Sequence, residues 1–230
     1  LLYYNDNQPE KALAAYKQVI SNYPGSEEAK IALQDLKSVY IDLNDINAYA
    51  SYVNSIGGNI RLEVGEQDSL TYIAAEKLFM RGDNDGARRS LINYLQTFPE
   101  GAFSSNANFY LGSIAFAKKE FDEAIQRFKS VIASGDTKFL EESVARTAEI
   151  EYLSKDYPAA LESFKRLQIV AENPENRQAA RLGIMRCALQ TGQQKDALLA
   201  ADELLKEPKL SPELEAEARY VRAKAYIAQK

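Results

Sequence analysis

The chain has 230 residues, of which 46% are hydrophobic and 27% charged, a composition typical of a folded protein with one large domain or an array of repeats. The formal net charge of −5 argues against nucleic acid as a partner, because nucleic-acid-binding proteins usually carry a basic field. Histidine, the commonest metal ligand and general base, is absent. The single cysteine, Cys187, excludes an internal disulfide and a site built from several thiolates, so we expect no metal and no cofactor.

The N-terminal residues 1–4, Leu-Leu-Tyr-Tyr, have the pattern of a helix that is already under way. We therefore expect the sequence to be a piece of a longer protein, in which case the missing signal peptide says little about location. No uninterrupted apolar run approaches the about 20 residues of a membrane-spanning helix. We expect no membrane insertion by this segment.

A small-then-large apolar pattern recurs along the chain at nearly constant spacing. The small residues are Ala12, Ala48, Ala87, Ala124, Ala160 and Ala197, and the residues four positions later are Tyr16, Tyr52, Leu91, Phe128, Phe164 and Ala201. The separations between successive alanines are 36, 39, 37, 36 and 37 residues. Such periodicity predicts an array of structural repeats.

Each repeat is predicted to be a pair of amphipathic helices, delimited by capping residues and by prolines that cannot continue a helix. The first helices are expected at residues 26–41, 67–81, 104–118, 138–154, 175–191 and 211–229. The second helices are expected at residues 9–21, 45–56, 84–97, 121–133, 157–171 and 194–206. These about twelve helices begin with a second helix and end with a first helix, so the first and last repeats are incomplete.

The connection at residues 57–68 lies in the longest spacing and differs from the others. It contains Ile60, Leu62 and Val64 in alternation, a strand-like period. One interpretation is an extended loop whose three apolar side chains pack against neighbouring helices. The other is a binding loop, since insertions in a repeat array map to one face.

The stretch 106–131 is the best-preserved unit, with Leu111-Gly112 on its first helix and Phe121, Ala124 and Phe128 on its second. It resembles a tetratricopeptide (TPR) repeat, whose usual period of about 34 residues is slightly shorter. The resemblance implies an all-α fold, a right-handed α-α superhelical solenoid of helix hairpins forming a single domain over residues 1–230. The implied repeat units are residues 1–24, 25–58, 66–99, 103–135, 138–172, 175–208 and 211–230.

The inter-repeat segment 98–112, and the turn Tyr23-Pro24-Gly25-Ser26 that echoes it, resemble TPR proteins of the Gram-negative cell envelope. These include the Tol-Pal coordinator, outer-membrane assembly lipoproteins and large TPR proteins of the Bacteroidetes. The resemblance implies a periplasmic or outer-membrane-associated location, with a cytoplasmic location as the alternative.

The sequence offers little for catalysis. Paired acids such as Asp83/Asp85 and Glu141/Glu142 lie in turns or first helical turns, where carboxylates complement the helix dipole and stay hydrated. Asp83-Asn84-Asp85-Gly86 lacks the ligand spacing of a calcium loop, and nucleophile arrangements that use histidine are impossible. Cys187 lies in an apolar run and is interpreted as a small core residue. We expect a protein that is not an enzyme.

TPR arrays typically bind partners in a concave groove lined by the first helices, and the resemblance implies where that groove lies. Its candidate binding residues are Tyr72, Glu76, Asn106, Tyr110, Ser113, Arg146, Glu149, Tyr152 and Arg186. Tyr110 and Arg146 are the central candidates, because exposed aromatic and arginine side chains supply most binding hot spots. Phe79, Phe109 and Phe116 are expected to pack between helices instead, and Tyr220 and Lys224 extend the same face.

Three functions remain open from the sequence. The first is a non-catalytic protein–protein interaction scaffold that binds a peptide or partner protein in its concave groove. The second is a structural spacer or self-association module. The third is a glycan-binding or small-molecule-binding receptor, which requires an enclosed aromatic pocket.

Overall fold

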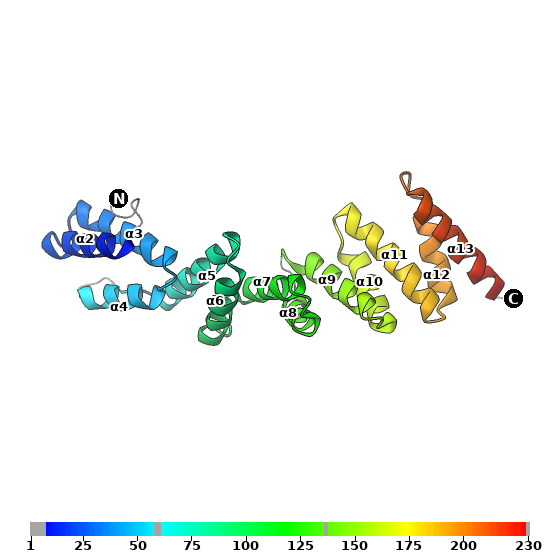
Figure 1. Ribbon diagram of the computed structural model, residues 1–230, viewed down its shortest axis with the longest axis horizontal. Helices are drawn as coiled ribbons and strands as arrows, with labels where there is room; N and C mark the ends of the chain where they lie inside the picture. The colour runs from blue at the N-terminus through cyan, green and yellow to red at the C-terminus, as the bar shows by residue number, and fades with distance from the viewer. Residues whose placement is uncertain (1–7, 58–60, 136–137, 229–230) are drawn as a thin grey trace. The chain divides into compact units, whose positions relative to one another are not determined.

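The computed structural model describes residues 8–57, 61–135 and 138–228, and these residues form twelve α-helices (Figure 1). The helices are α2 (Pro9–Asn22), α3 (Glu27–Asp42), α4 (Ile46–Ile56), α5 (Val64–Met80), α6 (Asn84–Thr97), α7 (Ser104–Ala117), α8 (Phe121–Ala133), α9 (Leu140–Leu153), α10 (Tyr157–Val170), α11 (Pro174–Gln190), α12 (Gln194–Leu204) and α13 (Pro212–Ala228). The all-α prediction is confirmed, and every helix boundary lies within three residues of its predicted position. None of the described helices is long and apolar enough to cross a membrane.

The chain divides into two compact units, Leu1–Ala107 and Asn108–Lys230. In the first unit, α3 packs on α2, α4 and α5, and α5 packs on α6, around a core that includes Leu36, Tyr40 and Tyr49. In the second unit, α8 to α13 each pack on the next helix along the chain. The larger core of this unit joins residues of α9 to α13 and includes Phe164 and Met185.

The turn between the two helices of a repeat has the same backbone conformation five times over. One residue in each turn has a left-handed φ: Asn44, Gly82, Lys119, Lys155 and Gly192. The next residue donates its backbone N–H to a carbonyl five residues back, as Asp45 does to Tyr40 and Asp156 does to Glu151. This pairing satisfies carbonyls at the end of the first helix, and it sets the reversal of each hairpin.

Small residues allow the helices of a hairpin to approach closely. A Cβ atom at Gly112 in α7 would lie 2.8 Å from Cε1 of Phe128 in α8, so the two helices approach closely here. Ala124 is fully buried beside Phe128 in the same cluster. Because side chains at such contacts fill the available space, larger residues here would displace a neighbour.

The first unit contains a buried polar contact between α5, α6 and the start of α7. Asp68 accepts a hydrogen bond from the Tyr94 hydroxyl (2.5 Å) and another from the Ala102 backbone N–H (2.9 Å). The Tyr94 oxygen in turn accepts the Phe103 N–H. Burial raises the pKa of Tyr94, so its hydroxyl stays protonated and able to donate.

The structure of the described residues in the connection 57–68 differs in part from the extended loop that the sequence predicted. Val64 already begins α5 and its side chain is 73% exposed, so it does not pack against neighbouring helices as predicted. Leu62 does pack against the core of the first unit, and Ile60 lies outside the described residues. Of the three alternating apolar residues, Leu62 thus lies in the connection before α5, and Val64 belongs to the helix itself.

Candidate functional site

The second unit contains a groove between the first helices α9 and α11, with α10 beneath them. We call it the α9–α11 groove, and its volume is about 280 Å³. Its lining residues are Glu142, Ala145, Arg146, Glu149, Tyr152, Leu153, Phe164, Leu167, Asn176, Ala179, Leu182, Gly183 and Arg186. Apolar side chains form its base, whereas charged side chains lie at its edges.

The base of the groove is fixed by α10. Phe164 is 8% exposed and Leu167 is 1% exposed, so both belong to the core and present only a small face to the groove. Gly183 of α11 lies against the Phe164 ring, where a Cβ atom would approach Cδ1 to 2.5 Å and lie closer still to Cγ and Cδ2. The absence of a side chain at Gly183 is thus what allows α11 to pack over Phe164.

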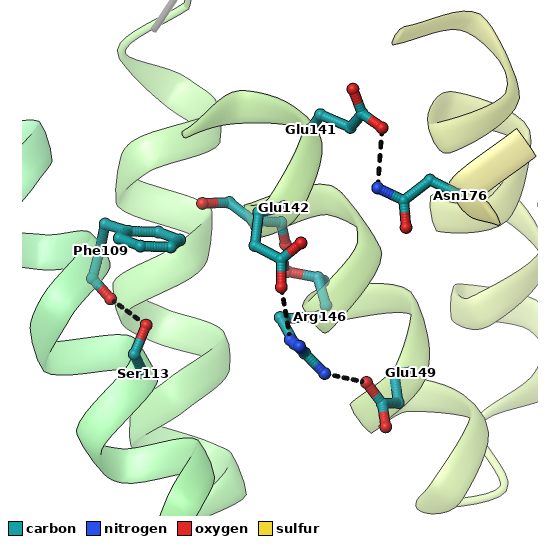
Figure 2. Close-up of polar contacts among 9 residues, drawn as sticks. Phe109, Ser113, Glu141, Glu142, Arg146, Glu149 and Asn176 are labelled. Atoms are coloured by element: carbon teal, nitrogen blue, oxygen red, sulfur yellow. Dashed lines mark hydrogen bonds and ion pairs between the residues drawn. The ribbon is translucent and has the colours of Figure 1, made fainter. Parts of the chain in front are cut away.

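Arg146 lies at the α9 edge between two carboxylates of the same helix (Figure 2). Its Nε donates to Glu142 Oε1 (2.8 Å) and its Nη1 donates to Glu149 Oε2 (2.9 Å). The guanidinium also lies 4.9 Å from the centre of the Phe116 ring of α7, a cation–π distance. Partial burial alone would lower the pKa of Arg146, but the two carboxylates raise it above its ordinary value, so Arg146 stays charged.

Arg186 lies at the α11 edge and is held from α13. Its Nε and one terminal nitrogen donate to the two oxygens of Glu217, each at 2.7 Å, in a bidentate pair. This hydrogen bonding raises the pKa of Arg186, and the nearby Tyr152 side chain of α9 adds to the effect. Arg186 is thus held toward α13 and stays charged.

Glu141, near the start of α9, joins this helix to the start of α11. Its carboxylate accepts the backbone N–H groups of Glu172 (2.9 Å) and Asn173 (3.1 Å) and the side-chain amide of Asn176 (2.7 Å; Figure 2). Burial acts to raise the pKa of Glu141, but these hydrogen bonds lower it below its ordinary value. The contacts fix the start of α11 against α9, and with it the width of the groove.

An apolar base with a few fixed polar groups at its edges can bury one side chain of a ligand while the edges hydrogen-bond to its backbone. In the part of the chain that the structure describes, no group of three or more histidine, cysteine, aspartate or glutamate side chains could hold a metal ion.

The structure brings four of the nine predicted site residues together. Arg146, Glu149, Tyr152 and Arg186 all line the α9–α11 groove. Their role in binding stays a prediction, which the proposal below develops.

Two predicted aromatic anchors, Tyr110 and Tyr72, are buried in the structure. Tyr110, a central candidate, is 7% exposed and packs edge-on against Phe109 and Phe139. Tyr72 is 2% exposed, with its ring stacked on Phe103 at a centroid distance of 4.5 Å. Both tyrosines therefore contribute core packing, and neither offers a surface to a partner.

The remaining three candidates make contacts within their own unit. The Tyr72 hydroxyl donates to Glu76 (2.6 Å) and accepts from the Asn106 amide (3.2 Å). Ser113 donates its hydroxyl to the Phe109 carbonyl of its own helix (2.9 Å; Figure 2). None of the three lines the α9–α11 groove.

Sequence reasoning missed several groove residues for which a signal exists. Glu142 lies four positions before Arg146, the spacing of a helical ion pair. Asn176, Ala179 and Gly183 share a helical face with Arg186, since they precede it by ten, seven and three residues. Extending each candidate by one helical turn would have found Glu142 and Gly183, whereas Ala179 and Asn176 lie two and nearly three turns before Arg186.

The fold and the groove define a helical-repeat protein built from consecutive helix hairpins. Family models described as tetratricopeptide repeat match residues 1–26 and residues 74–137. These two segments are therefore similar to tetratricopeptide repeats, the family that the sequence resemblance predicted.

The chain is also similar to solved structures, of which the first supports the same fold. The C-terminal part of a TPR repeat-containing protein from Cytophaga hutchinsonii is 15% identical, with a TM-score of 0.51, and the match covers 100% of this chain and 87% of that one. A tetratricopeptide repeat protein from Parabacteroides merdae is 14% identical (TM-score 0.41), covering 99% of this chain and 82% of that one. PilW, described as a widely conserved type IV pilus biogenesis factor, is 14% identical (TM-score 0.48), covering 93% and 92%. No curated protein matches the chain.

Proposed function

We propose that this chain is a non-catalytic interaction module that binds an extended segment of a partner protein in the α9–α11 groove. One apolar side chain of that segment contacts Phe164 and Leu167 at the base of the groove. The observation that carries the proposal is an open apolar groove between two first helices, with arginines at both edges that ion pairs keep in place. TPR domains are generally protein–protein interaction modules, which supports the same assignment.

The size of the groove favours one side chain over a larger ligand. Sites for small molecules usually have volumes of about 300–1,000 Å³, and the α9–α11 groove, at about 280 Å³, falls just below this range. Burying one leucine or phenylalanine contributes about 1.5–3 kcal/mol, whereas micromolar affinity requires about 8 kcal/mol. Backbone hydrogen bonds and charges at the groove edges must therefore supply the rest.

A glycan-binding receptor is a weaker alternative because the groove offers no open aromatic ring to a sugar. Phe164 is 8% exposed beneath Gly183. The Tyr152 ring packs edge-on against Tyr157 and Phe164. The aromatic side chains of the groove are thus engaged in packing.

Selection of a phage-displayed library of random peptides on the 230-residue chain tests the proposal. Peptides that survive selection are labelled, and their affinities are measured by fluorescence anisotropy. Ala179→Phe places a ring in the groove from an exposed position and is expected to weaken binding by about tenfold or more. Ala223→Phe, at an exposed position of α13 outside the groove lining, is the matched control. Equal affinity for wild type and Ala179→Phe would rule out the groove.

The location of this interaction is a separate proposal. The resemblance of residues 98–112 to envelope TPR proteins supports a periplasmic or outer-membrane-associated protein. Fractionation of the native cells followed by immunoblotting tests it, and recovery in the cytoplasmic fraction would overturn it.

A further inference from the structure

The lining of the α9–α11 groove carries two carboxylates and two guanidinium groups, and Glu217 adds a third carboxylate beside the groove, where it pairs with Arg186. Glu142, Glu149 and the Glu217 partner of Arg186 carry three negative charges, against two positive charges on Arg146 and Arg186, a net charge of −1. All five side chains are between 32% and 46% exposed, so a bound partner can reach them. The balance of charge at the groove is therefore slightly acidic.

The two arginines already form ion pairs with carboxylates of this chain. Arg186 uses two of its nitrogens on Glu217 in a bidentate pair. Arg146 uses Nε on Glu142 and Nη1 on Glu149. A carboxylate of the partner would have to displace these groups and would face like charges at the same edge, which costs binding free energy. The remaining N–H groups of Arg146 suit a neutral backbone carbonyl instead.

The α9 carboxylates, in contrast, retain accepting capacity. Glu142 accepts through Oε1 alone and Glu149 through Oε2 alone, and the second oxygen of each has no hydrogen-bond partner among the residues that the structure describes. An ionised carboxylate offers about four lone-pair positions, so each can accept further donors. Seven residues separate Glu142 from Glu149, which places them about 10 Å apart along α9, on either side of Arg146.

We propose that the partner segment carries a lysine or arginine within a few residues of its apolar anchor, and that this cation binds Glu142 or Glu149 at the α9 edge. The inference rests on the proposed function, because it assigns the chemistry of the segment bound in the same groove. The apolar anchor supplies contact with Phe164 and Leu167, and the cation determines which apolar segments bind.

The same phage selection tests this inference through the composition of the selected peptides. Lysine and arginine are expected to be enriched over aspartate and glutamate next to the apolar anchor, relative to the unselected library. For a selected peptide, Glu149→Gln is expected to weaken binding about three- to tenfold, and Glu142→Gln/Glu149→Gln to weaken it further. Glutamine keeps an oxygen that accepts from Arg146, so the edge of α9 retains its structure.

The matched control is Glu162→Gln, which removes the same charge from a 75% exposed position of α10 outside the groove lining. Its affinity for the selected peptide is expected to equal that of the wild type. Raising the salt concentration should weaken wild-type binding more than binding by Glu142→Gln/Glu149→Gln, since salt screens exposed charges.

The outcomes separate this inference from the proposed function. Enrichment of acidic residues, or unchanged affinity of Glu142→Gln/Glu149→Gln, with binding still lost in Ala179→Phe, overturns the basic partner and leaves the groove assignment intact. Selected peptides that bind Ala179→Phe as well as wild type overturn the groove itself, and the inference falls with it.

Discussion

Two physical effects predict opposite changes in stability for the substitution Gly183→Ala. In the interior of a helix, replacing glycine by alanine normally stabilises by about 0.5–1 kcal/mol, because alanine loses less backbone entropy on folding. At position 183 the new methyl group would overlap three atoms of the Phe164 ring. These atoms are near the attachment point of the ring, so a rotation cannot remove the overlap.

The overlap is expected to outweigh the gain in helix propensity. Overpacking a filled core lowers the free energy of unfolding by about 1–3 kcal/mol. Because the new methyl group overlaps Cγ, Cδ1 and Cδ2 of Phe164, we expect Gly183→Ala to lie near the upper end of this range. The net effect is a loss of about 2 kcal/mol, which increases local opening of α10 and α11 by a factor of about 30. Displacement of the ring into the α9–α11 groove should also weaken peptide binding.

Hydrogen exchange measured by mass spectrometry over residues 157–190 is the appropriate assay, because it reports the stability of α10 and α11 separately from the rest of the repeat array. Gly65→Ala is the matched control: this exposed helical glycine has no atom near its Cβ position, so it should be neutral or stabilising. In a Phe164→Leu background the overlap disappears, and Gly183→Ala should destabilise the protein much less. A stabilisation of about 1 kcal/mol by Gly183→Ala in the native background would refute the packing argument.

Three further predictions concern stability and reactivity. Asp68→Ala leaves the buried Tyr94 hydroxyl and the Ala102 N–H without their acceptor, so the first unit should lose about 2–4 kcal/mol in urea unfolding; a loss below about 0.5 kcal/mol would contradict the role of Asp68. Burial raises the pKa of the Cys187 thiol to about 11, so the native protein should resist alkylation near pH 8 and react only after unfolding in denaturant. Because the pKa of Glu141 is lowered in the folded state, its stabilising effect is complete above the ordinary value of 4.5 and disappears as the pH falls through the lower folded-state pKa. The melting temperature of wild type should therefore fall more between about pH 5 and pH 3 than that of Glu141→Gln, and parallel curves would contradict this.

The helices could be predicted from the sequence because local residues mark the beginning and end of each repeat. Ala124 with Phe128, and the equivalent pairs, recur at 36 to 39 residues, and prolines and capping residues delimit the segments between them. The repeated left-handed turn residue was less visible, since lysine occupies it at Lys119 and Lys155. Glycine and asparagine are the residues that usually mark such a position.

The candidate site was harder to predict because a first helix in a repeat array has two apolar faces. One face packs against its own hairpin and the next repeat, and the other lines the groove, so helical periodicity alone does not assign an aromatic residue to either. Tyr72 and Tyr110 followed the expected spacing but pack on Phe103 and Phe139, residues of the following connections. Arg146 was easier to place, because a charged side chain has only the solvent face available.

The partner's chemistry could not be read from single residues at all. Arg186 is paired with Glu217, which lies 31 positions later in the sequence and on another repeat. Arginine alone suggests an anionic partner, whereas the bidentate pair with Glu217 leaves the carboxylates of α9 as the groups able to accept a new donor. The tertiary structure therefore changes the expected partner from an anionic to a basic segment.

The central claim is that a partner segment binds between α9 and α11, and methyl NMR tests it most directly. Leu153 and Leu182 line the α9–α11 groove, and Leu153 is 56% exposed. Leu199 is 65% exposed in α12 outside the groove lining and provides the reference methyl groups. On titration with a selected peptide, the Leu153 and Leu182 methyl signals should shift with one common Kd, while those of Leu199 stay in place. Shifts confined to Leu199, or to methyl groups of the first unit, would contradict the claim.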